Sequence, residues 1–483
     1  MFTTIESAGA GIVPLESVAV YVHIPFCRTR CHYCAFYLET GFSPRVLRET
    51  VSGIVLEARE WMRRLGNPRI RTVYLGGGTP SVIPPAELER FLTELFDALG
   101  VAGSNADSGS HGGAARSDGA GPGSNVEGPG STAAAPGSNN APVDGRRPPE
   151  EITIEANPES VTDAFLDALR RSGVDRISLG VQSLCDRELA LLGRRSDAPT
   201  AREAIRRLER DWNGRWSADF IVGIPGQDAE EVSAQLDELA DRGAEHLSLY
   251  GLTVEPHTAL EQAVRRGSLR MPDRDEHEML WTAARSRAVR RGYRQYEVSN
   301  FALPGAESRH NRVYWRLDPY LGLGPGAVST LPVVVSGRPR ALRLTGGNIF
   351  AYQSVHRGTL AHDIELIDNI SFLFEHFMNG LRTAEGVSMQ RISERFGVDP
   401  EHLCARLHRS WRGFAQRDRR TDPTRTLRLR DSAREVVDSH LAELLDSLEG
   451  WEEARGLELR RQAWPPACER RGLDASGAKE HRR

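Results

Sequence analysis

The feature that most constrains the fold is an alternation of apolar runs with amphipathic helical patterns, repeated six times. The apolar runs lie at 18–24, 72–78, 151–158, 176–183, 217–225 and 245–256, and the helical segments that follow them lie at 43–64, 85–99, 161–172, 186–210, 229–242 and 274–292. Strands that are nearly all apolar are typical of a parallel sheet covered by helices. Because the crossovers in such a sheet are right-handed, the sequence predicts an α/β fold that curls into a full or partial barrel.

Unusual residues gather at the carboxyl ends of the predicted strands. Three cysteines follow the first strand, glycines follow the second, Glu155 and Gln182 end the third and fourth, and Asp219 lies within the fifth. In a barrel of this kind the chemistry sits at the carboxyl ends of the strands. The sequence therefore predicts one pocket that these residues share.

Composition divides the chain into domains. In residues 101–149, 37 of the 49 are Gly, Ala, Ser, Pro or Asn, which is too little apolar surface to form a core. We therefore expect a disordered insertion within a barrel domain that spans 18–330. The alternation stops there, and residues 331–450 predict a small, mostly helical domain with a winged-helix-like pattern. Residues 1–17 form an N-terminal lead, and residues 451–483 a flexible tail.

Charge and hydropathy limit the partners and the location. The formal net charge of −4 argues against nucleic acid as the main partner, and we expect the C-terminal helical packing to be structural. No stretch approaches the ~18 uninterrupted apolar residues of a membrane span. The lead has no basic or long apolar region, unlike a signal peptide. We therefore expect a soluble, cytoplasmic protein with reduced thiols.

The stretch YVHIPFCRTRCHYCAFY, residues 21–37, holds three of the six cysteines of the chain. These are Cys27, Cys31 and Cys34. Their spacing wraps a tight loop around one metal centre, but three thiolates are one ligand short of a closed zinc site or a fully ligated iron–sulfur cluster. A zinc site would need His23 or His32 as its fourth ligand. The alternative is a [4Fe–4S] cluster with one iron left open to bind and activate a ligand.

Six motifs, CRTRCHYCAF, YLGGGTPS, IEANPES, ISLGVQS, GIPGQ and LSLYGLTVEP, together resemble the radical S-adenosylmethionine superfamily. Within it the chain resembles the branch that holds oxygen-independent coproporphyrinogen III dehydrogenase (also called oxidase) and the heme chaperone HemW. The resemblance covers residues 18–447 apart from the insertion. It implies a radical SAM partial (β/α)6 barrel, a [4Fe–4S] cluster and S-adenosylmethionine as cofactors, and an electron donor for the cluster.

The resemblance also implies a role for each matching residue. The three cysteines would ligate the cluster, and its open iron would bind the amino and carboxylate groups of S-adenosylmethionine. Gly77, Gly78 and Thr79 match the loop that receives the amino group, where glycine allows the backbone a close approach. A carboxylate can hold ribose hydroxyls or an ammonium group, and an arginine can pair with a carboxylate. The remaining implied cofactor contacts are Tyr21, Glu155, Gln182, Arg194 and Asp219.

Two positions separate the members of the branch. The dehydrogenase pattern has a fourth cysteine two residues after the third, where this chain has Phe36, as in the heme chaperone. The stretch RHNRVYW, residues 309–315, matches the HNxxYW motif of the chaperone. By this resemblance His310 would be an axial ligand of heme iron, with Tyr314 and Trp315 as walls for the porphyrin. The competing interpretation is that the histidine caps a loop and the aromatic residues belong to the core.

Two histidines of the family pattern are absent. Val328 replaces one of them in GPGAVST, and Ser196 stands where the other follows the LGR stretch. His23 and His257 are reserve candidates for contacting heme. The sequence thus predicts a chaperone that binds heme and hands it to an acceptor protein, expected at a membrane. The alternative is a radical oxidoreductase of porphyrin biosynthesis, such as the dehydrogenase itself, and enzymatic turnover is left open.

Overall fold

The structure, a computed structural model, describes residues 10–101, 147–353 and 362–397 of the chain. Further along it describes 411, 415–417, 426–430, 441, 444, 445 and 448. Most of the predicted insertion and all of the predicted tail lie outside the described residues. No helix in the described ranges is long and apolar enough to cross a membrane.

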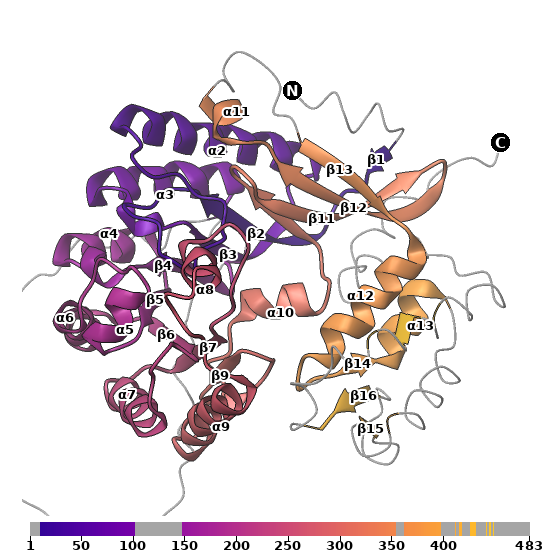
Figure 1. The fold of residues 1–483 in the computed structure, drawn as a ribbon. Coiled ribbons are helices and arrows are strands. Elements are labelled where there is room, and N and C mark those ends of the chain that lie inside the picture. The colour runs from indigo at the N-terminus through magenta and orange to yellow at the C-terminus, as the bar shows by residue number, and fades with distance from the viewer. Residues whose placement is uncertain are drawn as a thin grey trace, which may run out of the picture.

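Seven parallel strands form the centre of a single large sheet, and six of them are the predicted apolar runs (Figure 1). In spatial order these strands are β10 (Tyr320–Leu323), β2 (Ser17–Ile24), β3 (Arg69–Gly77), β4 (Glu151–Ala156), β5 (Arg176–Gln182), β6 (Arg215–Val222) and β7 (His246–Gly251). The seventh, β10, pairs with β2 in parallel. In the described part of the chain the sheet ends at β13 on one side and at β8 on the other and does not close, which is the arrangement of a partial barrel.

Antiparallel strands extend both sides of this parallel centre. They are β1 (Ala10–Ile12), β11 (Val328–Val335), β12 (Arg338–Gly346) and β13 (His362–Ile367) on one side, and β9 (Asn300–Ala302) and β8 (Arg294–Gln295) on the other. The predicted domain boundary at residue 330 falls inside β11, because the sheet continues through β13. Val328, one of the departures from the family pattern, begins β11 and pairs with Thr345 on β12.

Helices form an arc around the outside of the curved sheet (Figure 1). The helices that connect its strands are α2 (Pro44–Arg64), α3 (Pro85–Leu99), α4 (Asp163–Ser172), α5 (Asp186–Leu191), α6 (Ala198–Asp211), α7 (Ala229–Asp241), α8 (Ala259–Arg265), α9 (Arg274–Arg290), α10 (Arg309–Trp315) and α11 (Ile349–Gln353). Short 3-10 turns follow β3 and β4 at Pro80–Val82 and Pro158–Ser160. Several helices begin where a Ser, Thr or Asp side chain accepts a first-turn backbone N–H, as Ser43, Thr162 and Asp228 do, and these caps fix the helix starts.

Side chains on the central strands alternate between an apolar outer face and a polar inner face. Val73 and Leu75 of β3 are buried in the main hydrophobic core. The pleat turns alternate residues to the opposite face, and the strand register places Glu155 opposite Ser178. The inner face therefore differs from the nearly all-apolar strands that the sequence predicts, and it is lined with groups that can bind a polar ligand.

A second domain with its own core follows the sheet. Its elements are α12 (Asn369–Leu381), β14 (Val387–Ser388), α13 (Met389–Phe396), β15 (Ala415–Arg417) and β16 (Thr426–Leu429), and the three strands form one small sheet. This order of helix, strand, helix and hairpin agrees with the predicted winged-helix-like pattern. In Figure 1 the short helix α10 lies between this domain and the large sheet.

Candidate functional site

The loop after β2 carries the three clustered cysteines, all with free thiols that are partly exposed. Arg30 fixes the shape of this loop, because its guanidinium donates to the backbone oxygens of Cys34, Phe36 and Leu38 at 3.3, 3.2 and 2.9 Å. A hydrogen bond also joins the two ends of the loop, because the Cys27 N–H donates to the Glu39 backbone oxygen at 3.0 Å. Arg30 was not predicted, because it lies inside the cysteine motif and nothing in its spacing sets it apart.

Neither histidine considered for a zinc site is grouped with the cysteines in the described residues. Both ring nitrogens of His23 have partners, the Tyr21 hydroxyl at 2.9 Å and the Tyr37 backbone oxygen at 3.0 Å. His32 donates through Nδ1 to the Leu191 oxygen at 2.8 Å. No group of three or more His, Cys, Asp or Glu side chains in the described residues is placed to hold a single metal ion.

A chain of hydrogen bonds connects two of the cysteine sulfurs through the ends of three strands. The Cys27 sulfur lies 3.2 Å from the Thr79 hydroxyl, which accepts from the Asn157 amide at 3.2 Å. Arg194 donates to the Asn157 oxygen at 2.9 Å and contacts the Cys31 sulfur at 3.7 Å. Cys31, Thr79, Asn157 and Arg194 line one small cavity. Asn157 was not predicted, although its place at the end of the third predicted strand was a signal that could have found it.

The positive charge of Arg194 offsets negative charge on the sulfurs. Burial raises the pKa of the Cys27 thiol to about 11, while the Thr79 hydroxyl and Arg194 act in the opposite direction. Burial likewise raises the pKa of Cys34. These two thiols are therefore protonated at neutral pH in the absence of a metal. Metal binding would release their protons and form the thiolates.

The glycine loop after β3 packs closely against the site. A side-chain carbon at Gly78 would lie 2.7 Å from the Phe26 oxygen, and Gly77 has a φ of +104°, which side chains rarely adopt. The Gly78 and Thr79 N–H groups donate to the Ile24 and Phe26 oxygens, each at 2.8 Å. Only glycine permits this approach. The predicted contact of the loop with S-adenosylmethionine stays a prediction.

Two carboxyl groups face the interior next to the loop. Glu155 accepts from the Tyr74 hydroxyl at 2.9 Å and the Gly77 N–H at 3.1 Å, and Asp219 accepts from the Ser178 hydroxyl at 3.2 Å. Burial, followed by the charge of Asp219, raises the pKa of Glu155 to about 7, and burial raises that of Asp219 to about 6. A cationic or hydroxyl-rich ligand would restore their ionised forms.

We predict that Glu155→Gln changes how the stability of the cluster-free protein depends on pH. The Glu155 carboxyl binds its proton more tightly in the folded than in the unfolded chain, so its contribution to stability is full below the unfolded value and is lost as pH rises through about 7. Wild type should lose up to about 3 kcal/mol more than the variant between about pH 4 and pH 8. Urea unfolding across this range measures the two slopes, and equal slopes would contradict the prediction.

The other predicted contacts lie around these groups. Gln182 adopts a positive φ of 63°. A side-chain carbon added at Gly180 would lie 3.1 Å from the amide nitrogen of Gln182. Arg194 donates to the Gly180 oxygen at 2.7 Å, so Gln182 and Arg194 share this corner. Tyr21 lies farther along the interior, with its ring centre 6.2 Å from that of Tyr74. Ser196, the second departure from the family pattern, is buried and donates to Glu159.

His310 lies nearer the amino ends of the strands, where its ring stacks on that of Tyr74 at 5.2 Å. Its backbone N–H donates to Glu151, the first residue of β4, so α10 sits at the amino ends of the strands, opposite the cysteine loop. Its ring is inaccessible to solvent, with Nδ1 2.8 Å from the Thr72 hydroxyl and Nε2 2.9 Å from the Tyr314 hydroxyl. Burial lowers the pKa of His310 to about 4, so the imidazole is neutral. With both ring nitrogens engaged, this geometry does not favour the predicted ligation of heme iron.

Comparison with known proteins defines the family. Residues 21–239 match the model of the radical SAM superfamily, and residues 367–411 match that of the HemN C-terminal domain. The heme chaperone HemW of Synechocystis is 30% identical over 84% of this chain and 88% of its own length. The mouse mitochondrial radical S-adenosyl methionine domain-containing protein 1 is 33% identical over 77% of this chain and 74% of its own.

A solved structure agrees on the fold. Coproporphyrinogen III oxidase (HemN) of Escherichia coli superimposes with a TM-score of 0.64 over 92% of both chains, at 16% sequence identity. The likeness therefore extends to both domains, although at this identity it concerns the fold alone. Together with the sequence relatives, the cysteine loop and the strand-end residues around it, these matches establish that the chain belongs to the radical SAM superfamily, in the family of the heme chaperone HemW.

Proposed function

We propose that this protein is a heme chaperone, which binds heme and hands it to an acceptor protein. The observation that carries the proposal is the cysteine loop, with three thiols and Phe36 where the dehydrogenase pattern has a fourth cysteine. The Phe36 side chain is 69% exposed, so this position provides a surface and not a ligand. The relatives named heme chaperone HemW, which align over most of their length, support the same function.

The residues present fit the cofactors that the family implies. In this proposal Cys27, Cys31 and Cys34 would hold a [4Fe–4S] cluster, which would supply an open iron for binding S-adenosylmethionine. The chain's own groups then act around it. Arg194 balances charge at the Cys31 sulfur, from 3.7 Å away. The glycine loop lets the backbone approach the ligand, and Glu155 supplies a carboxylate for its ammonium or hydroxyl groups.

The partners and the location belong to the same proposal. We infer an electron donor that reduces the cluster, and an acceptor for heme that is associated with a membrane. Thiolate ligands persist in a reducing compartment, which supports the cytoplasm. Nucleic acid is not among the inferred partners, since the formal net charge of the chain is −4.

One observation favours a second candidate, a radical oxidoreductase such as coproporphyrinogen III dehydrogenase of porphyrin biosynthesis. The paired interior carboxyl groups of Glu155 and Asp219 are retained, with their hydrogen bonds, beside the cysteine loop. Enzymatic turnover is thus a distinct hypothesis and calls for its own assay.

Heme titration of the anaerobically reconstituted full chain tests the proposal. We expect saturable binding of heme, seen as a shift of its absorbance band, followed by transfer to an added apo-acceptor such as apomyoglobin. Bovine serum albumin loaded with heme is the control for passive release. Absence of saturable binding, or transfer no faster than from the albumin, would contradict the chaperone function.

A further inference from the structure

A cavity of about 720 Å³ lies between α10 and the C-terminal domain. Its walls come from β8 and α10 on one side and from α12, β14, α13 and β16 on the other. The volume lies within the range of small-molecule sites. Because α10 rests on the amino end of β4, this cavity is at the opposite end of the strands from the cysteine loop. It is therefore separate from the site described above.

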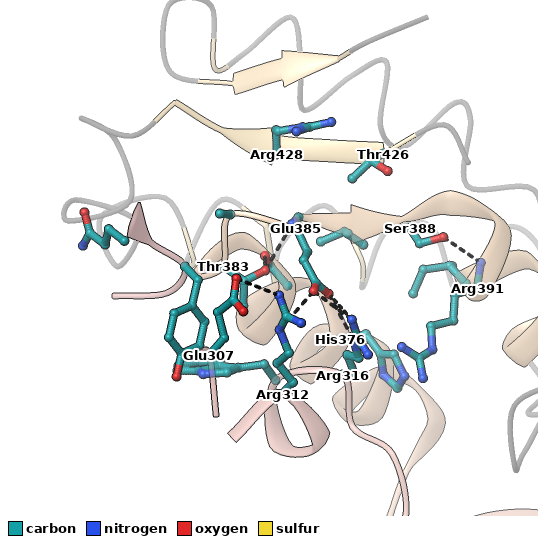
Figure 2. A pocket seen from close by; sticks show the side chains of 18 of the residues that line it. Glu307, Arg312, Arg316, His376, Thr383, Glu385, Ser388, Arg391, Thr426 and Arg428 are labelled. Carbon is teal, nitrogen blue, oxygen red and sulfur yellow. Dashed lines mark hydrogen bonds and ion pairs between the residues drawn. The ribbon is translucent and has the colours of Figure 1, made fainter. Parts of the chain in front are cut away.

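Positive charge predominates around the cavity. Arg312 of α10 and Arg316, the residue directly after this helix, share the carboxylate of Glu385 at 3.4 and 2.7 Å (Figure 2). Arg312 also pairs with Glu307 at 3.7 Å, so five arginines of the lining face two carboxylates. Figure 2 shows Arg428 on β16, on the other side of the cavity. Arg294 also lines it and is exposed, and its guanidinium has no ion pair or hydrogen bond within the described residues. Arginine forks of this kind suit carboxylates, which they bind through two parallel hydrogen bonds.

The stretch RHNRVYW supplies both sides of α10. His310 and Val313 are buried toward the sheet, whereas Arg312 and Trp315 line the cavity. The Arg312 guanidinium lies 6.0 Å from the ring centre of Tyr296, which also lines the cavity. The cavity thus combines aromatic surface, suited to a flat apolar ring, with cations suited to its acidic substituents. Of the two aromatic walls that the sequence predicts for heme, Trp315 is in this position and Tyr314 is not.

The cavity offers no imidazole to a metal from its described lining. His376 is the one histidine there. Its Nδ1 donates to the Phe372 backbone oxygen at 2.7 Å, and its Nε2 contacts Arg395. A ligand held here would be recognised through its acidic groups and its ring. If the ligand carried a metal, that metal would have no bond to a histidine of this lining.

We propose that this cavity binds a tetrapyrrole through its propionate carboxylates, without a protein ligand to the iron. The inference rests on the proposed heme chaperone function and assigns it a site. Arg294 and Arg428 hold the carboxylates, and Trp315 packs against the ring. Release then requires no metal–ligand bond to break, which suits a protein that passes its heme on.

Titration of the full reconstituted chain with heme, iron-free protoporphyrin IX and protoporphyrin IX dimethyl ester tests this site. Heme and protoporphyrin IX should bind with similar affinity, because the iron contributes no bond to the protein. The dimethyl ester, which lacks both negative charges, should bind weaker by roughly tenfold or more. The double variant Arg294→Glu/Arg428→Glu should weaken the binding of heme and of protoporphyrin IX by roughly tenfold or more.

Matched controls separate the site from the function. Arg59→Glu reverses a charge that is also exposed, on α2, and should leave binding unchanged. If the double variant does not fold, the same titration of the single variant Arg294→Glu replaces it. Binding of heme to the variants at wild-type strength, equal binding of the ester, or much tighter binding of heme than of protoporphyrin IX would overturn the site. Failure of wild type to bind any tetrapyrrole would instead remove the chaperone function, and the site with it.

Discussion

Anaerobic reconstitution of Cys27→Ala, Cys31→Ala or Cys34→Ala should give protein without a [4Fe–4S] cluster, whereas wild type should carry about four irons and four sulfides per chain. Each thiol lies on a loop whose shape Arg30 fixes through three backbone oxygens. His23 cannot replace a lost thiolate, because both nitrogens of its ring are engaged, and His32 is not grouped with the cysteines in the described residues. Iron and sulfide analysis, with the broad visible absorbance of the cluster, measures the loss.

The matched control is Cys185→Ala. Cys185 is a free cysteine outside the loop, at the start of α5, and its removal should leave the cluster intact. Arg194→Lys should keep the cluster while altering its spectrum, because the guanidinium contact with the Cys31 sulfur is lost. A stable zinc protein that takes up no iron, or retention of the full iron content in the three alanine variants, would refute the cluster assignment.

His310→Ala should lower the free energy of unfolding by roughly 2–5 kcal/mol and leave the heme affinity of the folded protein unchanged. The substitution opens a void under Tyr74, whose ring stacks on the imidazole at 5.2 Å. It also removes the partner of the buried Thr72 hydroxyl. Urea unfolding and heme titration on the same preparation measure the two quantities.

His257→Ala is the control, because His257 is exposed on the loop after β7 and should affect neither stability nor the fold. If it lowers heme affinity, this reserve candidate becomes the ligand. A loss of heme affinity in His310→Ala with stability intact would restore His310 as the heme ligand and contradict the structural role assigned to it.

The parallel centre of the fold could be predicted because its signal is local. Each of the six apolar runs is long enough to specify a strand, and each is followed by its own helix. The strands β10 to β13 were missed because their pairing is decided by distant partners, as when Leu321 of β10 pairs beside Val20 of β2. The polar inner face was missed for a related reason, since polar residues within apolar runs show their common face only once the register is known.

The sequence predicted the residue types of the candidate site better than the hydrogen bonds that connect them. Thr79 and Arg194 meet the cysteines, as one shared pocket requires. Asn157, which joins them, gave only a weak signal beside its acidic neighbour Glu155. The position of His310 could not be predicted, because the motif fixes its neighbours along α10 but not the end of the sheet on which α10 packs.

Turnover of coproporphyrinogen III by the reconstituted protein tests the central claim most directly. The assay supplies S-adenosylmethionine and a strong reductant to the same sample that binds heme, and follows decarboxylated porphyrinogen by chromatography after oxidation. We predict that the complete assay gives no more product than a control that omits S-adenosylmethionine. The reason is that Phe36 occupies the position of the extra cysteine of the dehydrogenase. Product that grows with time and requires both S-adenosylmethionine and Cys31 would contradict the chaperone account and make this protein an oxidoreductase.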